Sequence, residues 1–290
     1  SLDAGKDSKV RENKTNMTCQ EQLDRIIVKE KKLREKKDEI YLRLMYEMEE
    51  YGVKELLYKD LNEDKQDSMK IYFENEIQPF ISPQVVGKRQ PFPFLRNKEI
   101  YAVVELRTKS NNTKIGIIPC NNPVIKRMIP VSSDGRRFML AEELILHFVS
   151  KLYEKYEILE KSVMRVIRNA DIDAGSFDDE DLDYRNMMEH MVKQRNRLNP
   201  VCVQLNRKIN DKAKKKLTDY LEIGAKHLIE ERTPLDMSFV FQLQNVLKNK
   251  PELFYKKRVP QPSKEISMNE KIIPQIDNDI EGTEMSFGFQ

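Results

Sequence analysis

Four prolines between residues 79 and 93 constrain the fold more than any other feature of the sequence. They are Pro79, Pro83, Pro91 and Pro93. Proline lacks a backbone N–H and disfavours helical geometry in the residue before it, so no helix can run through this stretch. The last two prolines belong to the segment Pro91-Phe92-Pro93-Phe94-Leu95-Arg96-Asn97, an aromatic elbow that leads into a predicted strand.

Composition indicates a polar protein with a real core. The 290-residue chain is 39% hydrophobic and 34% charged, and its 51 Lys and Arg nearly balance its 48 Asp and Glu. Affinity for a polyanion would therefore require clustered charge. The densest basic run, from Arg207 to Lys216, contains no aromatic side chain, and a lysine-rich helix start is usually solvated surface, so we expect no nucleic-acid partner.

The cysteines and the apolar segments bear on the compartment. Cys19, Cys120 and Cys202 are far apart and form no CxxC pair, which is typical of reduced thiols in a cytosolic protein and predicts no zinc site. No segment approaches the roughly 20 apolar residues that span a bilayer. We expect a cytoplasmic protein without a membrane span, and peripheral membrane association stays open.

A long helix is predicted near the start of the chain. Thr18 and Glu21 form a capping box, and Gly52 is suited to end a helix that runs to about Tyr51. The middle of this helix, residues 34–39, is charged on every side, and we expect it to be a solvated face that lies against little. The apolar stripe comprises Leu23, Ile26, Ile27, Leu33, Ile40, Leu44, Met48 and Tyr51.

The remaining patterns predict an α+β fold, in which a mixed, largely antiparallel sheet is packed with helices. Residues 100–106 and 114–118 form a predicted hairpin around a turn at 110–112. Further strands are expected at 53–57, 127–131, 162–173, 201–205 and 227–229, and helices at 62–77, 140–153, 178–197, 211–221 and 238–248. The organisation predicted is a flexible lead-in at 1–17, the long helix at 18–51, one domain at 52–258 and a linker or tail at 259–290.

Four ordered segments carry a resemblance to a known family. They are Met17 to Leu23, Tyr72 to Pro83, the elbow Pro91 to Asn97, and Arg165-Val166-Ile167-Arg168-Asn169-Ala170-Asp171-Ile172-Asp173. Together they resemble polyphosphate kinase, the enzyme that moves phosphate reversibly between ATP and inorganic polyphosphate. The resemblance covers about Met17 to Arg258 and implies the last helix of the N-terminal domain followed by the whole head domain. The tail would lead towards C-terminal domains that this chain lacks.

Two departures mark a divergent member of that family. Ile167 stands where the family usually has threonine, and Val201-Cys202-Val203-Gln204 stands where it typically reads Val-Arg-Leu-Glu. The ion pair usual in that later strand cannot form from Cys202 and Gln204.

The resemblance also implies what this chain does not do. The family's phosphate-accepting histidine, its second histidine and its ATP and metal contacts belong to the C-terminal half, so we expect no catalytic, cofactor or metal residue here. The full-length enzyme would use ATP and Mg²⁺. None of His147, His190 and His227 has the setting of a phosphate-accepting imidazole, and we interpret all three as structural or surface residues. The chain alone would be inactive, serving dimerisation through the head domain and shaping the active-site tunnel.

Candidate contacts to the polyphosphate path are Arg168, Arg165 and Asn169. Arg165 and Arg168 are three apart, so on a strand they point to opposite faces, and Arg168 is the better candidate. Guanidinium binds phosphate oxygens in bidentate fashion, although Arg168 could instead pair internally with Asp171 or Asp173.

Other readings stay open at this stage. Phe92 and Phe94 are expected to anchor the elbow in the core or to dock on a partner subunit. Two alternative functions are a module that binds a polyanion such as polyphosphate or RNA, and an interaction scaffold built on the long helix. The family resemblance implies three partners: a second copy of the chain in a homodimer, inorganic polyphosphate, and the rest of the same polypeptide.

Overall fold

The structure is a computed structural model that describes residues 9–87, 92–168, 200–256 and 258. The chain forms two compact units, residues 1–246 and 247–290. The described part of the second unit contains one short 3-10 helix, Pro251–Leu253. Every other helix and strand that the structure describes belongs to the first unit. Outside the described residues lie the expected helix at 178–197, residues 169–173 of the segment that begins at Arg165, and the tail at 259–290.

Two sheets organise the first unit. The larger has six strands in the order β2-β4-β3-β7-β8-β9, and only its β8–β9 pair is parallel. The smaller has the order β1-β6-β5, with β1–β6 parallel and β5–β6 antiparallel. The predicted mixed, largely antiparallel sheet is therefore confirmed. The strands are β1 Lys54–Glu55, β2 Gln84–Val85, β3 Ile100–Arg107, β4 Thr113–Pro119, β5 Met128–Pro130, β6 Arg137–Leu140, β7 Glu157–Arg168, β8 Pro200–Leu205 and β9 Leu228–Glu230.

Helix α1 begins and ends where local signals predict. In α1, Cys19–Met48, the Glu21 N–H donates to Thr18 Oγ1 and the Thr18 N–H donates to Glu21 Oε2. A 3-10 turn, Glu49–Tyr51, extends it to Gly52, whose φ of 79° is left-handed. The other helices are α2 Glu63–Tyr72, continued by the π turn Phe73–Ile77, then α3 Ala141–His147, α4 Val149–Leu152, α6 Asp211–Leu221 and α7 Val240–Val246. Among the helices described, none is long and apolar enough to span a membrane.

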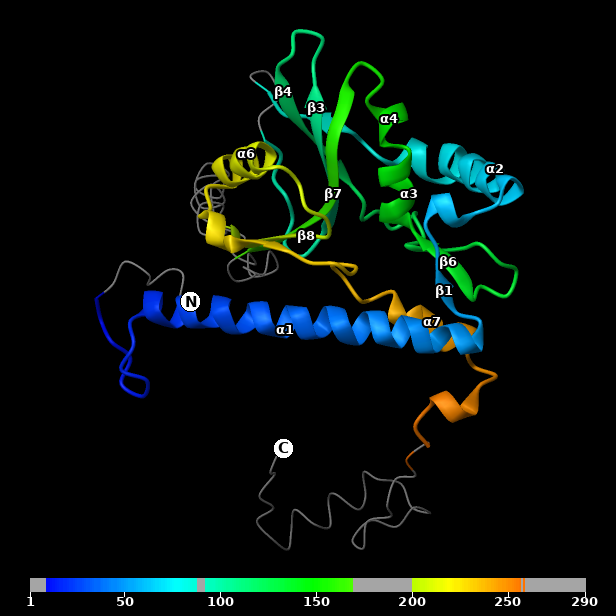
Figure 1. Ribbon diagram of the computed structural model, residues 1–290, viewed down its shortest axis with the longest axis horizontal. Helices are drawn as coiled ribbons and strands as arrows, with labels where there is room; N and C mark the ends of the chain where they lie inside the picture. Colours follow the sequence, from blue (N-terminus) through cyan, green and yellow to red (C-terminus); the bar gives the residue numbers. More distant parts are fainter. Residues whose placement is uncertain (1–8, 88–91, 169–199, 257, 259–290) are drawn as a thin grey trace, which may run out of the picture. The chain divides into compact units, whose positions relative to one another are not determined.

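The large sheet is buried on both faces, because side chains alternate along its central strand. On β3, Ala102, Val104 and Leu106 belong to a cluster completed by α3 and the π turn. Tyr101 and Val103 belong to a second cluster, which α6 completes with Ala213, Leu217 and Leu221. Figure 1 shows α6 and α3 on opposite sides of this sheet. Because successive side chains of a strand point to opposite faces, each face of the sheet presents apolar residues to one of the two clusters.

One expected helix is two helices preceded by a strand. The sequence predicted a single helix at 140–153, but Leu140 ends β6 and Phe148, at φ −89° and ψ 12°, separates α3 from α4. The apolar run at 138–140 is too short for periodicity to distinguish a strand from a helix. A smaller difference is at His227, which ends a 3-10 turn while β9 begins at Leu228.

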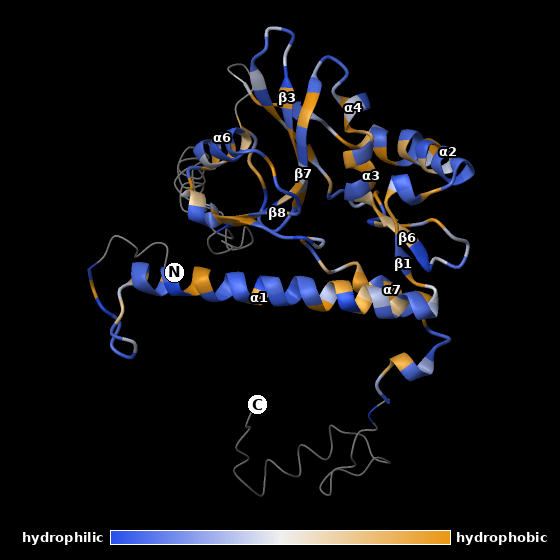
Figure 2. Cartoon of the chain, in the orientation of Figure 1, coloured by the Kyte–Doolittle hydropathy of each residue, from blue (hydrophilic) through white to orange (hydrophobic). Residues whose placement is uncertain are grey.

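The charged middle of α1 is partly buried, which contradicts the prediction that this stretch lies against little of the fold. Arg34 and Asp38 are the buried residues of this helix, at 8% and 9% exposure. Leu33 and Leu44 from the apolar stripe are instead 57% and 48% exposed. Figure 2 shows that α1 is largely hydrophilic along its length. The prediction failed because the rest of the fold supplies polar partners for the charged side.

Candidate functional site

The elbow and the segment that begins at Arg165 meet in the structure. The Lys98 N–H donates to Val166 O at 2.8 Å, and the Arg168 N–H donates to Asn97 Oδ1 at 2.9 Å. The Arg168 side chain then donates from Nε to Leu95 O at 2.6 Å. Residues 92–98 are thereby bonded along the end of β7, and we call residues 92–98 and 165–168 the bracket.

Arg165 joins the bracket to a third segment. Its Nε donates to Lys98 O at 2.9 Å, and its Nη1 donates to Leu235 O at 2.8 Å. Leu235 belongs to the first core cluster, whereas Leu95, which accepts from Arg168, belongs to the second. The two arginines thus contact opposite sides of the sheet, as the alternation of a strand predicts.

The aromatic side chains of the bracket divide between core and surface. The Arg168 guanidinium lies over the Phe94 ring, 4.3 Å from its centroid, and Phe94 is 41% exposed. The expectation that Phe94 anchors the elbow in the core is therefore wrong. Leu95 is fully buried instead, and half-buried Phe92 stacks on Tyr220 with ring centroids 5.2 Å apart. A proline on each side of Phe92 fixes the backbone but not which side chain turns inward.

One of the three candidate contacts cannot be placed. Asn169 lies outside the described residues, as do Asp171 and Asp173, the internal partners considered for Arg168. The structure therefore brings Arg165 and Arg168 to the same strand end and leaves the position of Asn169 open.

Most described contacts of the basic run from Arg207 to Lys216 are internal. Arg207 pairs with Glu143, and Lys214 pairs with Glu230 at 2.8 Å. The Lys216 ammonium donates to Thr113 O at 2.7 Å. These partners tie the run to α3 and to the sheet, which favours a structural surface over a polyanion track.

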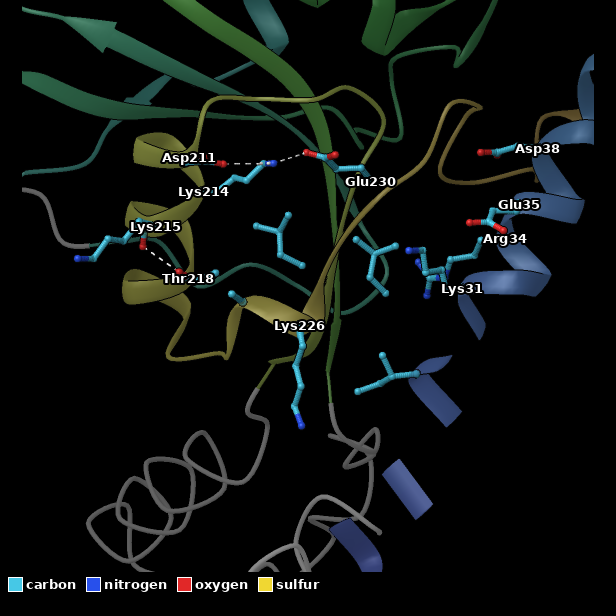
Figure 3. Close-up of a pocket in the computed structure, with 14 residues that line it drawn as sticks. Lys31, Arg34, Glu35, Asp38, Asp211, Lys214, Lys215, Thr218, Lys226 and Glu230 are labelled. Carbon is cyan, nitrogen blue, oxygen red and sulfur yellow. Dashed lines mark hydrogen bonds and ion pairs between the residues drawn. The ribbon is translucent and has the colours of Figure 1, made fainter. Parts of the chain in front are cut away.

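A pocket of about 620 Å³ lies between α1, α6 and β9. Figure 3 shows side chains of α1, among them Lys31 and Arg34, across the pocket from Lys214 of α6. Acidic and basic side chains share its walls. Sequence reasoning missed this pocket, because it requires α1 to lie beside elements almost 200 residues further along the chain. The lining residues are Ile27, Lys31, Arg34, Glu35, Asp38, Asp211, Lys214, Lys215, Thr218, Ala225, Lys226, Leu228, Ile229 and Glu230.

The described histidines are engaged in structural contacts. His147 stacks on Tyr58 with ring centroids 3.8 Å apart, and burial, aided by nearby Lys161, lowers the pKa of its imidazole. His227 places Nδ1 2.8 Å from Val201 O. Within the described ranges, no group of three or more His, Cys, Asp and Glu side chains could hold a metal ion.

The three cysteines are free thiols. Burial raises the pKa of Cys120, which lies inside the first core cluster. Burial also raises the pKa of Cys202, to about 11, although neighbouring Arg34 opposes this. Both thiols are therefore protonated at neutral pH, which makes them poor nucleophiles and poor metal ligands.

The fold and the bracket define an α+β domain with a long leading helix, and the comparisons identify its family. The family model described as the polyphosphate kinase middle domain matches residues 64–243. Because this match spans more than half of the sequence, the chain belongs to the polyphosphate kinase family.

Individual relatives agree with this assignment. The chain is 27% identical over 261 residues to a polyphosphate kinase of Halalkalibacterium halodurans, a match that covers 88% of this chain and 37% of that protein. It is 29% identical over 269 residues to one of Staphylococcus epidermidis, covering 91% and 36%. The crystal structure of polyphosphate kinase from Porphyromonas gingivalis shares the fold, with a TM-score of 0.61 at 16% identity, over 87% of this chain and 37% of that one. The chain thus spans little more than a third of the length of these relatives.

Proposed function

We propose that this chain is the head region of a polyphosphate kinase and that it acts as framework rather than as the chemical centre. The observation that carries the proposal is the match to the family's middle domain over residues 64–243. The full-length enzyme would transfer the terminal phosphate of ATP reversibly to inorganic polyphosphate and would use Mg²⁺. This chain would supply none of the ATP or metal contacts, and its shape would help to form the active-site tunnel.

The bracket supports the framework role. Arg165 donates from Nε to Lys98 O and from Nη1 to Leu235 O, two backbone carbonyls of other segments. A guanidinium held in this way positions three segments and is poorly placed to exchange partners with a phosphate. The internal pairs of the basic run likewise disfavour the alternative of a polyanion-binding module.

Arg168 remains our candidate contact to the polyphosphate path. Its guanidinium lies at the surface-facing side of the bracket, over the exposed ring of Phe94. In the full-length enzyme, Arg168→Lys would keep the charge but lose the planar fork, so we expect the KM for polyphosphate to rise several-fold with kcat little changed. Steady-state kinetics measure both. An unchanged KM for polyphosphate would contradict a contact between Arg168 and polyphosphate.

The purified 290-residue chain is expected to make no polyphosphate from ATP and Mg²⁺. Phosphoryl transfer through histidine requires an imidazole held by a partner and cations around the phosphates, and both described histidines are stacked or bonded to backbone instead. Product is measured as acid-insoluble phosphate against a reaction without protein. ATP-dependent chain synthesis above that background would contradict the framework role.

We also propose a cytoplasmic protein that self-associates through residues 52–258. The exposed ring of Phe94 is one surface for a second copy to cover. Sedimentation of the same sample across a hundredfold concentration range is expected to show a dimer. A strict monomer at the highest concentration would contradict self-association through this chain.

A further inference from the structure

The long helix α1 is docked on the rest of the first unit by charge. Glu231, which directly follows β9 and is 4% exposed, accepts from Arg34 Nη1 at 2.7 Å and is paired with Lys37. The same carboxylate accepts from Gln204 Nε2 of β8 at 2.7 Å. One buried carboxylate therefore gathers two cations of α1 and one amide of the sheet.

A second carboxylate lies on α1 itself and accepts hydrogen bonds from the rest of the first unit. Asp38 of α1 accepts from Thr233 Oγ1 at 2.6 Å and from the Arg232 N–H at 2.9 Å. Each side of the contact therefore contributes one buried carboxylate, Asp38 from α1 and Glu231 from the rest of the first unit. We call Arg34, Lys37 and Asp38, together with Gln204, Glu231 and Thr233, the clamp.

No apolar side chain of α1 is fully buried by this docking. Arg34 and Asp38 are the residues of α1 that count as buried. Six of its aliphatic side chains stay open to solvent, whereas Leu23, Ile27, Met45 and Met48 are half-buried. The six are Ile26, Val28, Leu33, Ile40, Leu42 and Leu44, which are between 39% and 63% exposed. Most helices in proteins are held by an apolar face, so α1 depends unusually on its polar contacts.

The desolvation of the clamp residues offsets part of the stabilisation that their hydrogen bonds and ion pairs provide. Burying charged groups costs desolvation free energy, which only complete hydrogen bonding offsets. Within the clamp, Arg34 Nε and Gln204 Oε1 are buried and find no hydrogen-bond partner. Detachment of α1 would return these atoms, and the ionised groups, to water. The free-energy difference between docked and detached α1 is therefore smaller than the number of contacts suggests.

We propose that α1 is a separable arm, which detaches from the rest of the first unit while the large sheet stays folded, and that the clamp sets the fraction docked. Detachment would remove one wall of the 620 Å³ pocket, because Ile27, Lys31 and Glu35 come from α1. The pocket is then present only in the docked state. A ligand that fills it would favour docking, since binding to one of two states shifts the equilibrium towards that state.

Hydrogen exchange of the whole chain, read by mass spectrometry, tests the arm. Glu231→Gln keeps the shape of the side chain and removes the charge that both cations face. We expect amides within residues 19–48 to exchange at least about tenfold faster, while those of β3 and β7 keep their wild-type rates. The matched control is Glu47→Gln on the same helix, where an exposed carboxylate lies 3.7 Å from Arg43 and no change is expected.

Two results would overturn the proposal. One is an unchanged α1 in Glu231→Gln, and the other is equal acceleration of α1, β3 and β7, which would mean that helix and sheet unfold together. Thr233→Val provides a milder test should Glu231→Gln fail to fold, because it removes only the hydroxyl that donates to Asp38. Thr233→Val should accelerate hydrogen exchange in α1 about threefold and leave exchange in β3 and β7 unchanged. Unchanged exchange in α1, or equal acceleration of α1, β3 and β7, would again contradict the proposal.

Discussion

Phe73→Ala is expected to lower the free energy of unfolding of the first unit by about 3–5 kcal/mol, the usual cost of emptying a core phenylalanine site. Phe73 is fully buried and stacks on Phe148 with ring centroids 4.7 Å apart. It lies in the π turn that continues α2 and packs in the cluster under β3. Removing the ring would leave a cavity between the helices and the sheet. Urea denaturation followed by circular dichroism measures the loss.

Phe80→Ala is the matched control for that substitution. Phe80 ends the next helical turn and is 43% exposed, so its loss should cost less than about 1 kcal/mol. Similar losses for the two variants would contradict the placement of Phe73 in the core.

Arg165→Met is expected to cost about 2–3 kcal/mol. Methionine fills much of the same volume, but it cannot donate to Lys98 O and Leu235 O, and hydrogen bonds from a charged donor are worth about 1.5–3 kcal/mol each before partial exposure reduces them. The control is Arg96→Met in the elbow, where the side chain is 75% exposed and its carboxylate partner Glu99 lies 3.5 Å away. That variant should stay within about 0.5 kcal/mol of wild type. Equal effects in urea denaturation would contradict the framework role of Arg165.

Local signals made much of the fold predictable. The capping box at Thr18 acts within three residues, and the structure confirms it. The hairpin of β3 and β4 followed from its turn in the same way. Strand β6 was missed because three apolar residues before a helix carry no period of their own. The clamp was missed because Arg34 meets Glu231 across 197 residues of sequence.

The candidate site was predictable as residues but not as geometry. The elbow and the second segment were singled out separately, and nothing in either predicted that Leu95 O would accept from Arg168. The sequence predicted only that Cys202 and Gln204 form no ion pair within the strand. It did not predict that Arg34 and Gln204 both donate to Glu231. Contacts between distant segments depend on packing that periodicity does not encode.

The most direct test of the proposed function is ATP-dependent polyphosphate synthesis by the full-length enzyme of which we propose this chain is the head region, purified and assayed with Mg²⁺. A head region needs the rest of its enzyme, so we predict that the full-length protein forms polyphosphate and releases ADP in equal amount. The 290-residue chain, assayed beside it, should form none. A stable full-length protein that makes no polyphosphate from ATP, and no ATP from polyphosphate and ADP, would contradict the assignment.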